Sequence, residues 1–388
     1  MKIRIVPAIC EIDAAAWDAC ANPEHGAAAI EGQERFNPFI THAFLSALER
    51  SRSVAGKTGW TPAHVAVEQK GRLVAAAPTY LKAHSLGEYV FDHGWADAYH
   101  RAGLDYYPKI QVAVPFTPVT GRRLLLACGT GAPVREALLT GLRTLREKID
   151  ASSIHVTFPT QDECEDLHRA GFSRRTGQQF HFLNPGYADF EAFLSELSAR
   201  KRKMIRRERK DALLGGIEIE LLTGAAIDEE HWDAFFGFYM DTGARKWGRP
   251  YLTRAFFSEV GSSMAEHILL VMAKRRGRMI AGALNFIGKD ALYGRYWGAV
   301  EEQPFLHFEV CYYQAIDYAI AHKLARVEAG AQGEHKLARG YVAVPTYSAH
   351  EIADPRFASA IDDFLTRERL AVGEALEEYA ELAPFKKG

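Results

Sequence analysis

Cysteine, long apolar runs and charge of one sign are all scarce in this sequence. Its 388 residues include five cysteines, an odd and scattered set without a Cys-x-x-Cys pair. This argues against a disulfide framework or a zinc knuckle and for a reducing compartment. No apolar run approaches the roughly 18 residues that cross a bilayer, and two acids by residue 13 interrupt any signal-peptide core. We therefore expect a cytoplasmic protein without a membrane span.

The charges nearly cancel, with 47 Lys and Arg against 49 Asp and Glu. The chain as a whole thus lacks the basicity of a nucleic-acid-binding protein, and any anion-binding surface has to be local. A hydrophobic content of 48% and a charged content of 25% are typical of a folded globular chain. At about 150 residues per domain, the length predicts two or three domains.

An internal repeat is the clearest organising pattern in the chain. Segments 63–82 and 267–288 each predict a hairpin, with tight turns at Lys70-Gly71 and at Gly277. Each is followed by an aromatic strand, an amphipathic helix, a short strand, a helical turn ending in Gly-aromatic, and a final strand. The first copy places these at 88–96, 134–149, 152–158, 167–172 and 178–183, and the second at 291–299, 308–319, 325–331, 337–341 and 345–351.

The repeat predicts two domains of one mixed α/β architecture. We place them at 1–185 and 186–388, with the boundary near Pro185-Gly186. The second domain carries a basic helix at 194–214 and ends in an amphipathic helix, roughly 357–382. Copy one is longer, and its surplus falls mainly at 97–125, which we interpret as a loop inserted after the aromatic strand.

Several long segments resemble the bacterial FemAB-like predicted N-acyltransferases, over about residues 30 to 370. They include GEYVFDHGWADAY (87–99), YYPKIQVAVPFTPVTG (106–121), RKRKMIRRERK (200–210) and EAGAQGEHKLARGY (328–341). The order of elements also resembles the GNAT fold, so the resemblance implies two tandem GNAT-like domains in a Fem-type arrangement. It further implies that an acyl group passes from an activated donor to an amine.

In the resembled fold, the aromatic strand and the short strand after the helix splay apart, and the donor carbonyl lies in the resulting notch. In domain two the resemblance places Tyr293, Arg295 and Trp297 on one side of the notch. Glu328 to Gln332 would line the other side, opening onto Glu334-His335. In domain one, Phe91, Asp92, His93 and Trp95 would face residues 155–159.

An alkylammonium with a pKa of about 10.4 needs a base before it can attack a carbonyl. The first choice for that base is Glu334 and the second is His335, while Tyr293 could protonate the leaving group and Glu309 is a further carboxylate. Acids in the first turn of a helix are also common for purely structural reasons, because the helix dipole stabilises them. Without a HExxH motif we predict no metal site and no tightly bound cofactor.

The segment 200–210 holds eight basic residues and one acid. On a helix its side chains form a basic stripe, which is either a solvated face or a site for a polyanionic donor. We assign donor binding to this stripe and to the notch, through Lys201, Arg202, Lys203, Arg206, Arg207, Arg295, Glu328 and Gln332.

Two co-substrates fit that polyanion, aminoacyl-tRNA and acyl-CoA. The segment EEQPFLHFE (301–309) has no glycine and starts with two acids, which departs from the phosphate cradle of acyl-CoA enzymes. This favours aminoacyl-tRNA as the donor. The pair Gly129 and Gly131 before the first-domain helix leaves an acyl-CoA enzyme as the first alternative. A catalytically silent adaptor that binds tRNA or another polyanion is the second.

The acceptor is expected to be a small-molecule or peptide amine bound by domain one. The aromatic strand and the inserted loop supply the candidate residues Asp92, His93, Trp95, Tyr106, Tyr107 and Lys109. An equally weighted alternative is that the two tyrosines cap the domain interface. The residues leave the acyl group, the acceptor and the oligomeric state open.

Overall fold

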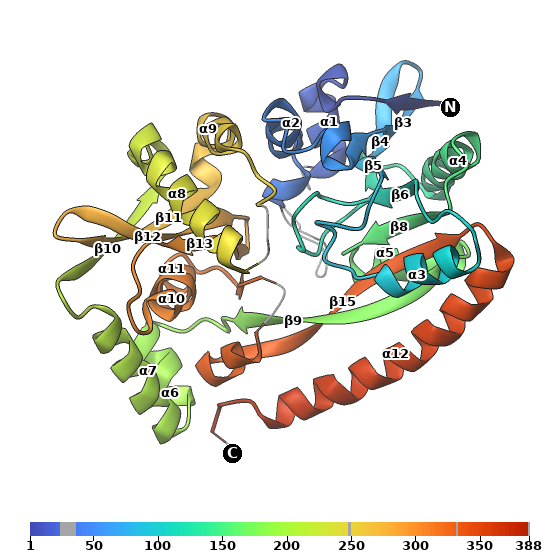
Figure 1. The fold of residues 1–388 in the computed structure, drawn as a ribbon. Helices are drawn as coiled ribbons and strands as arrows, with labels where there is room; N and C mark the ends of the chain where they lie inside the picture. The colour runs from blue at the N-terminus through green and yellow to red at the C-terminus, as the bar shows by residue number, and fades with distance from the viewer. Residues whose placement is uncertain (24–35, 247–249, 331–332, 387–388) are drawn as a thin grey trace. The chain divides into compact units, whose positions relative to one another are not determined.

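The computed structural model describes residues 1–23, 36–246, 250–330 and 333–386, which form two compact units. The first unit consists of Met1–Gly177 and Pro345–Glu374, and the second of Gln178–Val344 and Ala375–Gly388. Strands β9 (Ser173–Leu183) and β15 (Tyr341–Ile352) and helix α12 (Pro355–Glu381) contribute residues to both units (Figure 1). The chain therefore crosses the boundary three times, whereas the sequence suggested one crossing near Pro185.

The first unit contains two sheets. One has the strand order β1-β3-β4-β7, and the other includes the order β15-β8-β6-β5-β2. The strands are β1 (Lys2–Val6), β2 (Trp60–Pro62), β3 (His64–Gln69), β4 (Arg72–Ala77), β5 (Thr79–Lys82), β6 (Lys109–Val112), β7 (Leu125–Leu126) and β8 (Ser153–Thr157). The helices are α1 (Ala14–Ala21), α2 (His42–Arg50), α3 (His93–Arg101), α4 (Ala132–Lys148) and α5 (Gln161–Arg169).

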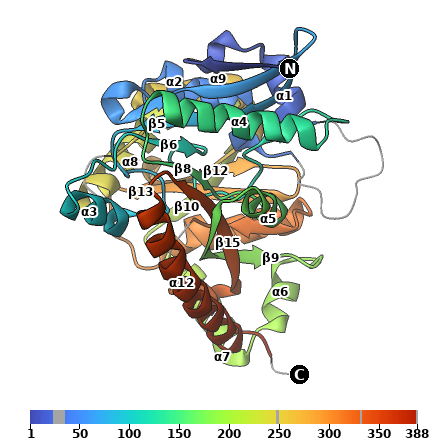
Figure 2. The ribbon, with the colours of Figure 1, turned by 90° about the vertical axis from the view of Figure 1, so that its right-hand side faces the viewer.

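Helix α4 packs on β1, β3 and β4 and closes the core of this unit (Figure 2). Its buried face carries Leu138 and Leu142, which belong to one apolar cluster with Val65 of β3. A Cβ at Gly141 would lie 2.7 Å from the Val65 side chain, so glycine lets the helix approach the strand. The leucines whose helical spacing predicted this element thus form the face of α4 that packs on the strands.

The second unit contains a sheet with the order β10-β11-β12-β13-β14-β9. The strands are β10 (Ile217–Thr223), β11 (Ile268–Arg275), β12 (Arg278–Ile287), β13 (Ala291–Ala299) and β14 (Arg326–Glu328). The helices are α6 (Phe190–Glu196), α7 (Ala199–Ala212), α8 (Glu229–Lys246), α9 (Arg254–Ser263), α10 (Leu306–Phe308) and α11 (Gln314–Ala321), with a π-helical turn at Glu309–Tyr313 between the last two.

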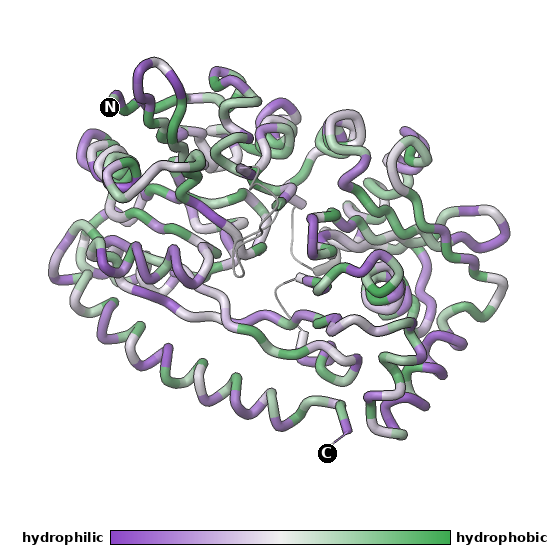
Figure 3. Tube along the Cα trace, turned by 180° about the vertical axis from the view of Figure 1, so that it is seen from behind, coloured by the Kyte–Doolittle hydropathy of each residue, from purple (hydrophilic) through white to green (hydrophobic). Residues whose placement is uncertain are grey.

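The structure confirms most of the repeat. Both hairpins form, β3-β4 and β11-β12, and Gly71 and Gly277 turn at φ of +76° and +77°. The predicted helices, short strands and final strands of both copies are present, as is the C-terminal helix α12. Hydrophobic and hydrophilic residues alternate along α12 (Figure 3), and Ile361 and Leu365 bury its apolar side against Trp95.

The expected aromatic strand at 88–96 is wrong. Asp92 lies at the N-terminal boundary of helix α3 instead, and the parallel partner of β8 is β6, with Ile110 opposite Ile154. In the second unit β13 pairs in parallel with β14 in the same way. The additional segment of the first copy therefore precedes the strand rather than follows it. The physical reason is that all four residues of β6 are buried, whereas Asp92, His93 and Gly94 interrupt the apolar alternation of 88–96.

No helix in the described part of the chain is long and apolar enough to cross a membrane. Within the same residues, no three His, Cys, Asp or Glu side chains come together in a way that could hold a metal ion.

Candidate active site

In the second unit, strands β13 and β14 separate after three residue pairs. They pair in parallel from Ala291 opposite Arg326 to Tyr293 opposite Glu328, where β14 ends. Strand β13 continues along β12 to Ala299, with a bulge that leaves Arg295 between the pairs Asn285–Gly294 and Leu284–Tyr296. The bulge bends β13 at the point where its second neighbour ends, so a notch opens beyond Tyr293 and Glu328.

This notch holds a cavity of about 180 Å³. Its lining comes from β12, β13, the turn after β14 and the start of the helical segment that includes α10: Ala283, Leu284, Asn285, Gly294, Arg295, Tyr296, Trp297, His307, Cys311, Tyr312, Ala329 and Gly330. A Cβ at Gly294 would lie 3.3 Å from Asn285 Oδ1 and 3.6 Å from Ala329 Cα. Glycine therefore keeps the narrow end of the notch open.

Asn285 is the most deeply buried polar side chain of the lining, with 0% of its surface exposed. Its Nδ2 donates to the carbonyl oxygens of Leu269 at 3.2 Å and Ala283 at 3.4 Å. Its Oδ1 accepts no hydrogen bond from the residues that the structure describes. The side chain thus brings an unsatisfied acceptor to the bulge, where polar recognition is possible.

Tyr293 and Glu328 lie in the paired part of the two strands, at the base of the notch. Both are buried, and Arg326 Nε donates to Glu328 Oε1 at 2.9 Å while its guanidinium lies 5.9 Å from the Tyr293 ring centre. Glu328 Oε2 lies 3.8 Å from His181 Nε2. These contacts tie the base of the notch together, and neither residue is part of the cavity lining.

The carboxylates proposed as bases lie outside the cavity lining. Glu334 is exposed and accepts a hydrogen bond of 2.7 Å from the Tyr379 hydroxyl of α12. Glu309 is buried and binds the Arg209 guanidinium, with Nη2 to Oε1 at 2.9 Å. Gln332, the last predicted notch residue, lies outside the described residues.

His335 is connected to the notch by Tyr312. Its Nε2 lies 3.0 Å from the Tyr312 hydroxyl, and Tyr312 is part of the cavity lining. Burial raises the pKa of Tyr312 well above the ordinary value, so the phenol keeps its proton at neutral pH. The sequence pattern assigned Tyr312 only to the apolar helix face. The sequence feature that could have pointed to Tyr312 as a notch residue is its position five residues after His307, on the helical segment that starts beside the notch.

Lys336 is a buried cation beside the notch that the sequence did not reveal. Its Nζ donates to the carbonyl oxygen of Gly330, a lining residue, at 3.0 Å. Burial, together with the charge of Arg295, lowers its pKa to about 8. The ammonium holds the turn after β14 in place, and it does so as a group that titrates close to neutral pH.

We expect Lys336→Met to flatten the pH dependence of stability. Between pH 8 and about 10.4, the lysine pKa of an unfolded chain, the unfolded chain holds a proton that the folded protein lacks. Wild-type stability should thus rise with pH in this window, by up to about 1.4 kcal/mol per pH unit from this group. Urea unfolding of wild type and Lys336→Met from pH 7 to 10 measures the difference between their free energies of unfolding. Both proteins keep Lys82, so its contribution to the pH dependence is the same in both and cancels in the difference. If the free energies of unfolding of the two proteins changed in parallel with pH, the lowered pKa of Lys336 would be contradicted.

Helix α7 divides its basic residues between two environments. Arg209 contacts Glu309 and Asp317, Arg202 donates to main-chain oxygens, and Arg206 contacts Glu191. The remaining exposed cations, Arg200, Lys203, Arg207 and Lys210, follow one another at helical spacing and form one solvent face. Only Arg207 of these four has an acidic partner, Asp211 at 3.2 Å, among the described residues. We call these four residues the α7 face.

In the first unit, five of the six predicted acceptor residues come together. Lys109 Nζ donates to Glu88 Oε2 at 2.7 Å, to Ser85 Oγ at 2.9 Å and to Asp92. Tyr106 donates to Asp92 at 2.7 Å. Tyr107 contacts Ser85, and Trp95 stacks on His155. His93 is exposed and does not join them. We call this group, with Lys82, the Lys109 cluster.

The Lys109 cluster holds two ammonium groups and two carboxyl groups out of water. Burial lowers the pKa of Lys82 to about 7, with its Nζ 3.6 Å from Glu88 and 3.6 Å from the Trp60 ring centre. Burial raises the pKa of Glu88, whereas Lys109 holds that of Asp92 far below its usual range. Groups shifted in opposite directions are frequent at functional sites. Sequence reasoning missed Lys82 and Glu88.

Comparison with known proteins gives a family and a fold. A FemAB-like family model, described as peptidoglycan biosynthesis/recognition, matches residues 8–387. No curated protein matches. Among solved structures, FemX matches with a TM-score of 0.53 at 12% identity, covering 93% of this chain and 100% of FemX.

Two further solved structures match this chain over almost their whole length. L-PGS from Bacillus licheniformis matches with a TM-score of 0.50 at 9% identity, covering 87% of this chain and 99% of its own. A conserved protein of unknown function from Bacteroides thetaiotaomicron matches with a TM-score of 0.51 at 12% identity, covering 90% and 99%. At these identities the likenesses concern the fold, and they confirm the expected Fem-type α/β architecture.

Proposed function

The chain belongs to the FemAB-like family, and from that premise we propose that it transfers an activated acyl or aminoacyl group to a primary amine. The observation that carries the proposal is the separation of β13 from β14 after Tyr293 and Glu328. Beyond Tyr293, the described residues include no strand that pairs with β13 on the side away from β12, so main-chain N–H groups of β13 border the notch. Such groups can stabilise the oxyanion of a carbonyl under attack.

The reaction requires two proton transfers. The acceptor ammonium gives one proton to His335 through the Tyr312 hydroxyl, which His335 Nε2 contacts at 3.0 Å. The amine nitrogen then bonds to the carbonyl carbon. The bond from that carbon to the donor oxygen or sulfur breaks, and the second proton leaves with the departing atom. The products are an amide and the free donor alcohol or thiol.

Aminoacyl-tRNA is the donor we favour. The turn that leads into α10 holds Glu301, Glu302 and Pro304, and acids at that position disfavour the phosphates of coenzyme A. The α7 face supplies cations for an RNA backbone instead. We assign donor binding to this face and to the notch.

We expect the triple variant Arg200→Gln, Lys203→Gln and Lys210→Gln to weaken tRNA binding. Each lost phosphate contact should reduce the slope of log K against log salt by about 0.7–0.9. Fluorescence anisotropy with labelled tRNA at several salt concentrations measures this slope. The matched control removes three exposed cations elsewhere in the second unit, Arg276, Lys289 and Lys323. If both triples change the slope equally, the α7 face is not the binding surface.

Mass spectrometry of reaction products tests the proposed function. The protein is incubated with a pool of charged tRNA, or with acyl-CoAs, and with a panel of primary amines. An amide formed from charged tRNA supports the proposal. An amide formed only from acyl-CoA would favour the alternative donor, for which Gly129 and Gly131 precede α4. Binding of tRNA with no amide from either donor would favour the adaptor.

A further inference from the structure

An unsatisfied acceptor borders the narrow end of the notch. Asn285 lies on β12 directly opposite Gly294 of β13, so the two positions share one face of the sheet. Glycine has no side chain to cover the amide, and a Cβ at Gly294 would lie 3.3 Å from Asn285 Oδ1. The same point lies 3.5 Å from the carbonyl oxygen of Glu328. Two oxygens therefore border the space beside Gly294, and a ligand group that donates hydrogen bonds is favoured there.

The hydrogen bonds of the Asn285 amide fix which of its atoms faces this space. Its Nδ2 donates to the carbonyl oxygens of Leu269 and Ala283, which uses both of its hydrogens. Turning the amide over would set Oδ1 against these two oxygens, so the observed orientation is the stable one. Oδ1 accepts no hydrogen bond from any described residue, although the side chain is 0% exposed. An unpaired acceptor at this depth is destabilising, and a ligand that donates to it removes the penalty.

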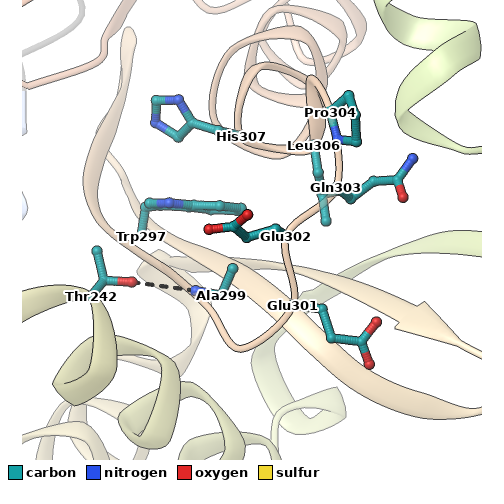
Figure 4. Close-up of a pocket in the computed structure, with 9 residues that line it drawn as sticks. All are labelled: Thr242, Trp297, Ala299, Glu301, Glu302, Gln303, Pro304, Leu306 and His307. Atoms are coloured by element: carbon teal, nitrogen blue, oxygen red, sulfur yellow. Dashed lines mark hydrogen bonds between the residues drawn. The ribbon is translucent and has the colours of Figure 1, made fainter. Parts of the chain in front are cut away.

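This acceptor belongs to the notch and not to the larger cavity beside it. That second cavity has a volume of about 560 Å³ and shares Trp297 and His307 with the notch (Figure 4). Its polar lining includes Thr242, whose Oγ1 accepts a hydrogen bond of 3.4 Å from the Ala299 main-chain N–H. Asn285 lines only the notch. A group that donates to Asn285 is therefore bound in the notch itself.

The chemistry of the acyl group decides what can donate to Asn285. A plain acyl chain presents only C–H groups to Oδ1. An aminoacyl group carries an amine on the carbon next to the carbonyl carbon, so its amine can donate to Asn285 while its carbonyl stays in the notch beyond Tyr293 and Glu328. Tyr312 lines the same cavity, so the proton path proposed for the acceptor reaches that carbonyl.

We propose that Asn285 selects an aminoacyl donor over a plain acyl donor, by accepting a hydrogen bond from the α-amino group. The inference rests on the proposed function and deepens it, because that function admits both classes of acyl group and the α7 face concerns only the polyanion. A site with a buried acceptor rejects an analogue without the matching N–H, since the acceptor then stays unpaired. Selection of the acyl group is thus separate from binding of the RNA.

Two matched donor analogues test this selection without any turnover. In 3′-glycylamido-3′-deoxyadenosine and 3′-propionylamido-3′-deoxyadenosine, a stable amide replaces the ester at the end of a charged tRNA. The two analogues differ only in an amino or a methyl group on the carbon next to the carbonyl carbon. Isothermal titration calorimetry of the full chain measures both dissociation constants. We expect wild type to bind the glycyl analogue at least about ten-fold more tightly, through one hydrogen bond to a buried acceptor.

The matched variants are Asn285→Leu and Thr242→Val, which each replace a polar side chain by an apolar one of similar size. We expect Asn285→Leu to reduce the preference for the glycyl analogue to less than about two-fold. Thr242→Val alters only the second cavity and should keep the wild-type preference. The thermal midpoint checks that each variant is folded, and Asn285→Ala replaces Asn285→Leu if leucine does not fit. Equal affinities in wild type, a preference that survives the loss of Asn285, or no binding of either analogue would overturn the proposal.

The same analogues separate this inference from the proposed function. If amide forms from charged tRNA but wild type binds both analogues equally, the transferase activity stands and the role of Asn285 is wrong. If the preference is found and depends on Asn285, but no donor yields an amide, the amine site stands and the transferase activity is wrong.

Discussion

Replacing Lys109 by methionine is expected to lower the free energy of unfolding by about 3–5 kcal/mol at pH 7. The side chain is 0% exposed, and its ammonium donates to Ser85, Glu88 and Asp92. Methionine fills a similar volume but leaves two buried carboxylates without their main cation. The penalty comes from those uncompensated charges rather than from lost packing. Urea unfolding of the full chain measures it.

The pH dependence identifies the cause of that loss. Without Lys109, burial should raise the pKa values of both Glu88 and Asp92 above those of the unfolded chain. A raised carboxyl pKa lowers stability above the unfolded value, near 4, and the loss disappears as pH falls toward it. We therefore expect the difference between variant and wild type to shrink from pH 7 to pH 4. A difference that is independent of pH would indicate a packing defect.

Two control variants complete this experiment. Adding Glu88→Gln and Asp92→Asn to Lys109→Met should restore much of the stability, because the two carboxylates that would be left buried without their main cation are then uncharged. Lys148→Met changes an exposed lysine of α4 in the same unit and should alter stability by less than about 0.5 kcal/mol. A loss below 1 kcal/mol for Lys109→Met would contradict the electrostatic account of the Lys109 cluster.

The elements that the sequence predicted are those with a regular period and a clear turn. The spacing of the leucines in α4, and the apolar runs on either side of Gly71 and Gly277, can be recognised within each short segment of the sequence. The segment 88–96 has aromatic residues like those of β13, and similarity between the copies suggested a strand. Its Asp92, His93 and Gly94 begin a helix instead, since the buried run at β6 supplies the strand.

The candidate site could be predicted only in part, because its chemistry depends on contacts distant in sequence. Arg209 belongs to the basic run, but its position is set by Glu309, 100 residues later. Glu334 has a favourable place in the pattern, yet it bonds to Tyr379, 45 residues further along the chain. The lowered pKa of Lys336 comes from burial, which no local pattern encodes.

Enlarging Gly294 is expected to have the largest effect on activity. The Cβ of Gly294→Ala would contact Asn285 Oδ1 at 3.3 Å and the Glu328 carbonyl oxygen at 3.5 Å, so alanine narrows the notch slightly. Gly294→Val adds a Cβ and two methyl groups beside a cavity of about 180 Å³. We expect kcat/KM to fall a few-fold with alanine and at least about 100-fold with valine, because a displacement of about 1 Å at the reacting carbon costs that much. The measurement is amide formation with charged tRNA.

Stability separates a blocked notch from a damaged fold. Gly294 lies in strand β13 without a positive φ, and valine favours extended backbone, so the thermal midpoint of Gly294→Val should stay close to that of wild type. Binding of tRNA through the α7 face should also persist, because that face lies on another element. A Gly294→Val protein that transfers at the wild-type rate would show that the acyl group does not enter between β13 and β14. In that case the separation of the strands would be a feature of the fold alone.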